Sequence, residues 1–326
     1  MKRKMNKKVS IIIPVYRAAD TVERCVRTLC EGTYKNIEIL LIEDWSPDDS
    51  WSVCLDLQDK YVQVKAFRNE KNLGVSATRN RGLQEMTGHY LMFVDSDDWT
   101  EPDFVESFVN AHTMYGADMT VCGYMNHDEV QNYRTDYFGW EETDEIIERP
   151  LKESLIALLK GRLLQQIWNK FFLVSVIKTN AVCFDESIKF GEDFRFVLSY
   201  LRHCQGDKLV TINRPLYHYI RCSTTSAMSN FGTEGIDESL KNLRMMYEVM
   251  GKSDEEIEAK LIKDREDQLR SYAYMIMHNM GMKLAQKKEH IYALDKLLGK
   301  QLYKENKKLY VKERFIIFAK RIGLKK

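Results

Sequence analysis

The first hundred residues alternate between short apolar runs and amphipathic stretches. Residues 9–16 (VSIIIPVY) are a continuous, largely β-branched apolar run, which is typical of a strand covered on both faces. The next stretch repeats apolar residues at helical spacing, and Asp20 with Glu23 predicts a capping box at its start. This order indicates βαβ units around a largely parallel sheet. Further strands are predicted at 37–42, 62–67 and 90–94, with helices at 49–61 and 74–86.

After residue 103 the alternation changes. A helix is predicted at 104–115 and a strand at 119–124. The polar, aromatic stretch at 126–148 is compatible with a hairpin, and Pro150 precedes another predicted helix.

From about residue 234 onward the sequence has a helical pattern throughout, and Ser253 with Glu256 predicts a second capping box. We therefore expect an α/β domain at residues 1–230 and a helical C-terminal region at residues 231–326.

The composition is that of a soluble globular protein and excludes an integral membrane protein. Of 326 residues, 44% are apolar and 30% are charged, as in soluble globular proteins. No apolar run approaches the roughly 18–20 residues that a membrane-spanning helix needs. The seven cysteines form no CxxC pair, which favours reduced, buried thiols in a cytoplasmic protein.

Charge is concentrated at the two ends of the chain. Residues 1–8 carry five basic residues, and residues 304–326 carry nine against two acids, although the whole chain has a net charge of only +1. The acidic body does not suit nucleic acid. One face of the last predicted helix is apolar and the others are basic, which favours an anionic membrane surface and a location peripheral to the inner face of the cell membrane. Packing of this apolar face on the body is the alternative; the face comprises Val311, Phe315, Phe318 and Ile322.

Candidate chemistry lies at the predicted strand ends, where parallel α/β sheets bind ligands. These ends carry Tyr16, Asp44 and the DSDD cluster at 95–98, and no glycine-rich phosphate loop is present. Asp95 and Asp97 are spaced to hold a hard divalent cation, which would bridge diphosphate oxygens. The alternative is a polar loop whose aspartates cap the following helix.

Four segments together resemble the serial signatures of family 2 glycosyltransferases with the GT-A fold. They are VSIIIPVYRAADTVERCVRTL, IEILLIEDWSPDDS, NLGVSATRNRGL and GHYLMFVDSDDW, in the family's order and spacing. The resemblance covers about residues 8–225. It implies a Rossmann-like, mostly parallel central sheet flanked by helices, here with an α-helical C-terminal extension.

The resemblance also implies roles for individual residues. Tyr16 would line the base pocket, and Asp44 would accept the N3–H of uracil or thymine. Arg79 would approach the nucleotide or the aspartates, with packing or a surface ion pair as the alternative for Tyr16 and Arg79. Trp45 departs from the small residue usual there, so the shape of the base pocket is open. The residues assigned to the nucleotide-sugar are Pro14, Tyr16, Asp44, Arg79, Asp95, Ser96 and Arg221; those assigned to Mn²⁺ or Mg²⁺ are Asp97, Asp95 and His218.

Two middle motifs complete the resemblance. In the segment FGED at 190–193, Asp193 would be the general base and Glu192 the substitute; capping of a helix start is the alternative. Trp168, in WNK, would lie beneath the acceptor pocket or serve as a core residue. His218 is equally compatible with packing in a strand.

The sequence therefore predicts an inverting, metal-dependent glycosyltransferase. It would move a sugar from a nucleotide-diphosphate-sugar, most consistent with a UDP-sugar, to a glycan or lipid-linked hydroxyl in cell-surface polysaccharide synthesis. One alternative is a non-catalytic nucleotide-sugar-binding scaffold at the membrane surface. Another is a phosphatase of the haloacid-dehalogenase type. The segment VDSDD also resembles the aspartyl motif of that class, although there the motif usually follows the first strand.

Overall fold

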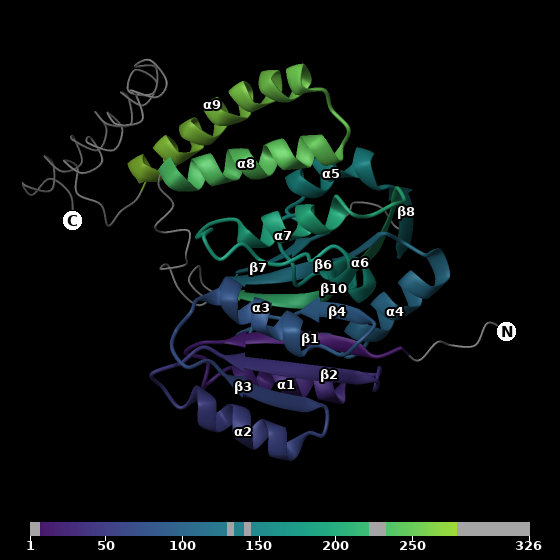
Figure 1. The fold of residues 1–326 in the computed structure, drawn as a ribbon, viewed down its shortest axis with the longest axis vertical. Coiled ribbons are helices and arrows are strands. Elements are labelled where there is room, and N and C mark those ends of the chain that lie inside the picture. The colour runs from purple at the N-terminus through teal and green to yellow at the C-terminus, as the bar shows by residue number, and fades with distance from the viewer. Residues whose placement is uncertain (1–6, 129–133, 140–144, 222–232, 279–326) are drawn as a thin grey trace, which may run out of the picture. The chain divides into compact units, whose positions relative to one another are not determined.

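The structure is a computed structural model that describes residues 7–128, 134–139, 145–221 and 233–278 (Figure 1). The predicted C-terminal amphipathic helix lies outside these residues. The chain divides into two compact units: Met1–Phe231 with Met245–Gly251, and Gly232–Arg244 with Lys252–Lys326.

Four parallel strands form the N-terminal half of the sheet in the first unit, in the order β3-β2-β1-β4 (Figure 1). All seven residues of β2 are buried, as expected for strands covered on both faces. Right-handed crossovers place α1 and α2 on one face and α3 on the other. The bounds are β1 Val9–Val15, α1 Val22–Glu31, β2 Ile37–Glu43, α2 Ser50–Lys60, β3 Val64–Arg68, α3 Val75–Glu85 and β4 Tyr90–Phe93.

The other half of the sheet is mixed. Strand β9 runs antiparallel between β4 and β6, while β10 runs parallel to β6. The predicted α/β class is confirmed, but the parallel arrangement is interrupted at β9. Strand β6 extends beyond the predicted 119–124 because it pairs with both β10 and β7. The bounds are β5 Trp99–Thr100, α4 Phe104–Tyr115, β6 Met119–Asp128, β7 Arg134–Phe138, β8 Ile146–Pro150, α5 Leu151–Lys160, β9 Lys170–Leu173, α6 Val174–Thr179, α7 Glu192–Leu201 and β10 Lys208–Arg221.

A cluster of four buried phenylalanines joins α7 to the sheet. Phe93 of β4 and Phe172 of β9 meet at 6.0 Å between ring centroids, and Phe184 stacks on Phe196 at 4.3 Å. Phe93 also contacts Phe196 of α7 edge-on at 5.5 Å. Because Phe196 lies one turn after the start of α7, this packing fixes the first residues of α7 near the end of β4.

The two predicted capping boxes have different outcomes. The one at Asp20 is wrong: α1 begins at Val22 after Thr21, without a side-chain cap, because the backbone N–H groups of Thr21 and Val22 both donate to Ala18 O. The one at Ser253 is confirmed, since Ser253 N donates to Glu256 Oε2 at 3.0 Å and Glu256 N donates to Ser253 Oγ at 3.3 Å.

The described part of the second unit is helical. Within it, Gln268 Nε2 donates to Ser239 Oγ at 3.0 Å, and Arg244 pairs with Glu258. Across the described ranges, no helix combines the length and apolar character needed to cross a membrane. The bounds are α8 Thr233–Val249, whose residues from Met245 onward belong to the first unit, and α9 Asp254–His278.

Candidate active site

The predicted site residues gather at the carboxyl edge of the parallel strands. Tyr16 follows β1, Asp44 follows β2, and Asp95 lies just beyond β4. Asp44 N donates to Val15 O at 2.9 Å, so the ends of β1 and β2 are in register. Parallel strands bring these ends to the same side of the sheet, where α/β proteins bind ligands.

Asp44 is buried and held in place by three donors. Asn69 Nδ2 and Leu73 N donate to its Oδ1 at 2.8 and 2.9 Å, and Gly74 N donates to Oδ2 at 2.8 Å. Gly74 has φ +87°, a conformation that favours glycine. Sequence reasoning overlooked Asn69 and Gly74 as supports of Asp44; for Gly74 the NLG segment at 72–74 was the signal. Oδ2 retains capacity for a further donor.

The rim around Asp44 carries exposed aromatic side chains. Tyr16 is 45% exposed and Trp45 is 50% exposed. The loops after β1 and β2, which carry these two residues, are joined because Arg17 N donates to Ser46 Oγ at 3.1 Å. Pro14 lies within β1 opposite Ile42 of β2. The pairing of β1 with β4 ends at Ile12, so the missing N–H of Pro14 leaves no gap in the hydrogen bonds between β1 and β4.

Arg79 of α3 connects the two groups of acidic residues. Its buried guanidinium donates from Nη1 to Asp193 Oδ1 at 2.7 Å and from Nη2 to Asp95 Oδ1 at 3.1 Å. Its Nη1 also lies 3.8 Å from Glu192 Oε1. Helix α3 can approach the sheet closely because Gly82 faces Ile12, where a Cβ would lie 2.6 Å from that side chain. The proposed base and the first aspartate of the DSDD cluster therefore share one cation.

The carboxyl groups of Asp193 and Asp97 hold a proton more strongly than a carboxyl group usually does. Burial raises the pKa of Asp193 to about 7, and Glu192 and Asp95 add to the increase while Arg79 and Lys170 oppose it. Burial, together with the charge of Asp95, raises the pKa of Asp97 to about 6. Both increases come mainly from burial, which disfavours a charged carboxylate.

Asp98 supports the turn from within the protein. It is fully buried and accepts from Tyr217 Oη at 2.6 Å and Ile220 N at 2.8 Å. Tyr217 stacks on Trp168 at 4.3 Å between ring centroids, and its Oη accepts from Asp95 N at 3.1 Å. Trp168 is a core residue that contacts the DSDD turn through Tyr217.

Lys170, the last residue of the WNK segment, is also structural. Its Nζ donates to Leu163 O at 2.7 Å, to Asn169 Oδ1 at 2.8 Å and to Gln166 O. These three acceptors match the three N–H donors of an ammonium group, although burial lowers the pKa of Lys170 to about 7. The segment ties the turn before β9 to the sheet.

Asp95 and Asp97 suit a hard divalent cation. Carboxylate oxygens are the ligands that Mg²⁺ and Mn²⁺ prefer, and burial raises the pKa of Asp97 to about 6 even though Arg24 opposes this increase. Among the described residues, no group of three or more candidate ligands is arranged to hold a metal. A cation here would therefore take its other ligands from a bound diphosphate or water. Ser96 lies between the two aspartates and is half-buried.

The role of His218 as a metal ligand stays a prediction, and in this structure its ring has other partners. Its Nε2 lies 2.9 Å from Glu101 Oε1 and its Nδ1 lies 2.9 Å from His127 Nε2, and the ring stacks on Trp99 at 3.4 Å. Both ring nitrogens are hydrogen-bonded, so a metal bound here would have to replace one of these two partners. Arg221 Nη1 pairs with Asp128 Oδ2 at 3.0 Å, and its contact with a phosphate stays a prediction.

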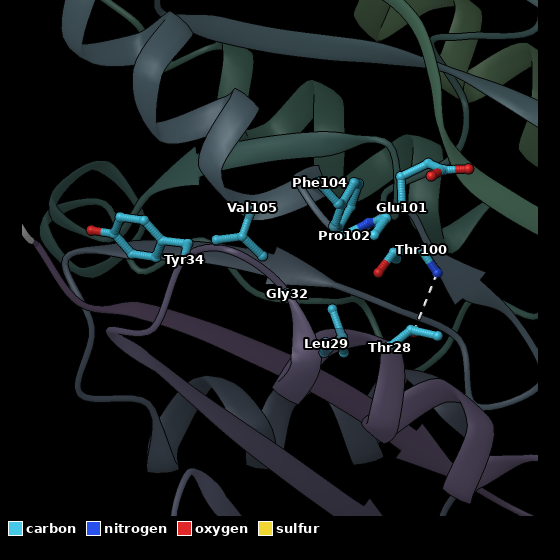
Figure 2. A pocket seen from close by; sticks show the side chains of 9 residues that line it. All are labelled: Thr28, Leu29, Gly32, Tyr34, Thr100, Glu101, Pro102, Phe104 and Val105. Atoms are coloured by element: carbon cyan, nitrogen blue, oxygen red, sulfur yellow. Dashed lines mark hydrogen bonds between the residues drawn. The ribbon is translucent and has the colours of Figure 1, made fainter.

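A small hollow lies between the end of α1 and the start of α4 (Figure 2). The space between its lining residues, open solvent included, is about 180 Å³. Thr100 N donates to Thr28 Oγ1 across it at 3.4 Å. None of the site carboxylates lines it, so we do not assign it a role in the chemistry.

Comparison with known proteins identifies the class. A family model described as "Glycosyl transferase family 2" matches residues 10–174, just over half of the chain. The chain therefore belongs to family 2 of the glycosyltransferases, as its motifs predicted.

Curated relatives carry the same description. Glycosyltransferase GlyA of Streptococcus pneumoniae serotype 4 is 30% identical over 216 residues, which cover 65% of this chain and 30% of GlyA. The uncharacterized glycosyltransferase EpsJ of Bacillus subtilis is 27% identical over 212 residues, 65% of this chain and 60% of EpsJ. The chain spans less than two thirds of the length of either relative.

Solved structures support the fold. The S. aureus TarS fragment 1–349 in complex with UDP-GlcNAc superimposes with a TM-score of 0.66 at 16% identity, covering 97% of this chain and 92% of that one. The same fragment in complex with UDP gives a TM-score of 0.62 at 18% identity, with the same coverage. These similarities confirm the predicted GT-A-like architecture.

Proposed function

We propose that this glycosyltransferase uses a UDP-sugar and transfers the sugar to an acceptor hydroxyl in one displacement with inversion. The observation that carries the proposal is the Arg79 bridge, which places Asp193 and Asp95 on one guanidinium at 2.7 and 3.1 Å. A base for the acceptor and a carboxylate for the donor side are thereby held together.

The uridine preference follows from Asp44. Its fixed, buried carboxylate retains acceptor capacity at Oδ2, which suits the N3–H of uracil. The TarS fragment of the same fold was solved with UDP and with UDP-GlcNAc, which supports a UDP-sugar as donor here.

The transfer step uses Asp193 as the base. Its carboxylate takes the proton of the acceptor hydroxyl while that oxygen forms a bond to the anomeric carbon. The bond from this carbon to the diphosphate oxygen breaks, and its electron pair leaves with UDP. A pKa of about 7 suits a general base near neutral pH. A divalent cation on Asp95 and Asp97 would supply positive charge for the departing diphosphate.

The acceptor proposal is separate from the chemistry. We infer a glycan or lipid-linked acceptor of a cell-surface polysaccharide, presented at the inner membrane face, from the basic, amphipathic pattern of residues 304–326. A non-catalytic scaffold is less well supported, because such a protein would not need a carboxylate held beside the donor-side aspartate.

Calorimetric titration of UDP, dTDP, GDP and CMP, with and without Mn²⁺, tests the donor site. We expect UDP to bind most tightly and only with the metal. Asp97→Ala should abolish the metal-dependent part, whereas Asp103→Ala, which removes the Arg214 partner at 2.6 Å, should leave it unchanged. Absence of metal-dependent binding for every nucleotide would refute the proposal.

A further inference from the structure

Trp45 occupies a backbone conformation that its side chain does not favour. Its φ is +56°, in the left-handed region, where a bulky residue is an outlier. Arg17, on the neighbouring loop after Tyr16, also has a positive φ, of 53°. Backbone strain of this kind concentrates at functional sites and persists where the surroundings hold it.

The contacts of Trp45 hold its ring in place without burying it. The Arg68 guanidinium lies over the indole at 4.6 Å from the ring centroid. Arg68 Nε in turn lies 2.8 Å from Oε2 of the fully buried Glu43. The indole nevertheless remains 50% exposed. A strained residue that is supported from one side and open on the other is suited to contact a ligand.

The surroundings of Asp44 are apolar as well as exposed. Leu73 and Val75 are 49% and 42% exposed, and they flank Gly74, whose N–H donates to Asp44. With Tyr16 and Trp45, four exposed apolar residues come from the loops that meet at Asp44. Exposed apolar groups near a few fixed polar ones are typical of a ligand-binding surface.

We propose that Trp45 is a second wall of the nucleobase pocket and contributes binding energy by contact with the uracil ring held at Asp44. This inference rests on the proposed UDP site. A planar base with an N3–H satisfies both observations, since its edge can donate to Asp44 and its face can cover exposed indole. The other candidate occupant, an apolar part of the acceptor, has no need of the Asp44 carboxylate.

The test compares Trp45→Asn with wild type, because asparagine tolerates a positive φ and lacks the ring. We expect UDP affinity to fall about ten-fold, the size of one base-stacking contact. UMP affinity should fall by the same factor, since the loss concerns the base rather than the diphosphate. The melting temperature should stay equal to wild type or rise, because strain is relieved.

Two further variants act as controls. Trp45→Phe should retain most of the affinity. Trp51→Phe, which alters the other tryptophan near Arg68, at 5.6 Å, should leave UDP binding unchanged.

Wild-type binding of UDP by Trp45→Asn overturns the inference, as does a change confined to the acceptor KM. A fall in melting temperature without loss of affinity assigns Trp45 a structural role and also overturns it. Failure of the wild-type protein to bind UDP instead refutes the proposed function, so the two failures are distinguishable.

Discussion

Removal of Arg79 should destabilise the protein in a pH-dependent way. The Arg79 side chain is 4% exposed and faces Asp95, Glu192 and Asp193, whose side chains retain exposures of 28, 19 and 24%. Arg79→Gln would leave three carboxylates close together without their shared cation.

The size of the effect follows from burial. Loss of one partner from a buried ion pair costs about 3–5 kcal/mol. Since these carboxylates retain some exposure to water and Asp193 can take up a proton, we expect about 2–3 kcal/mol at pH 8. At pH 6 the loss should be about 1 kcal/mol smaller, because partial protonation of Asp193 relieves the repulsion.

The sign of the pH dependence is fixed by the raised pKa of Asp193. The pKa of this acid rises from 3.8 in its ordinary state to about 7 in the fold. The folded state therefore binds the proton more tightly. The resulting stabilisation is complete below about pH 4 and is lost as the pH rises through about 7. Without Arg79 the pKa of Asp193 should rise further, which steepens the loss.

Thermal unfolding of wild type and Arg79→Gln between pH 5.5 and 8.5 measures this. We expect the melting temperature of Arg79→Gln to lie roughly 5–10 °C below that of wild type at pH 8, because each kcal/mol of lost stability lowers it by roughly 2–4 °C. Arg202→Gln, which breaks the more exposed pair with Glu248, is the control and should change little. The reasoning is wrong if Arg79→Gln lowers the melting temperature as much at pH 6 as at pH 8, or if it lowers the melting temperature no more than Arg202→Gln does.

Two other predictions address catalysis and the fold. Asp193→Asn should lower the transfer rate by about 10²–10⁴ while the Kd for UDP stays within about two-fold; a rate near wild type would assign the base elsewhere. Burial raises the pKa of Glu38, but hydrogen bonds from Lys8, Ser10 and Thr87 outweigh it and hold the pKa at about 2. Its contribution to stability is therefore present above about pH 4.5 and lost on acidification. Glu38→Gln should reduce the melting temperature at pH 7 much more than at pH 3, and an equal reduction at both would contradict this account.

Much of the α/β framework was predictable because it depends on local patterns. The run VSIIIPV is a strand covered on both faces in any parallel sheet, and the helix predicted at 104–115 has the observed bounds. Pro150 precedes α5 as predicted. The prediction of a capping box at Asp20 was wrong because the backbone N–H groups of Thr21 and Val22 donate to Ala18 O instead. Residue types alone do not decide which acceptor these donors use.

The candidate site was predictable only as a set of residue types at strand ends. Tyr16, Asp44 and Asp95 follow parallel strands, so strand direction alone brings them to one edge. Which carboxylate shares a cation with which was not accessible, because Arg79 and Asp193 are 114 residues apart and meet only when α7 packs on Phe93.

The sequence by itself determined the family, the order of strands and helices up to about residue 124, and the edge of the sheet that carries the chemistry. Those features follow from hydrophobic periodicity and from short motifs that act over a few residues. The tertiary structure decided that His218 is hydrogen-bonded at both nitrogens, that Asp98 is buried beneath Tyr217, and that Trp45 remains exposed. These outcomes depend on which distant side chains compete for each polar atom and how much water is excluded around it, and only the packed chain sets both.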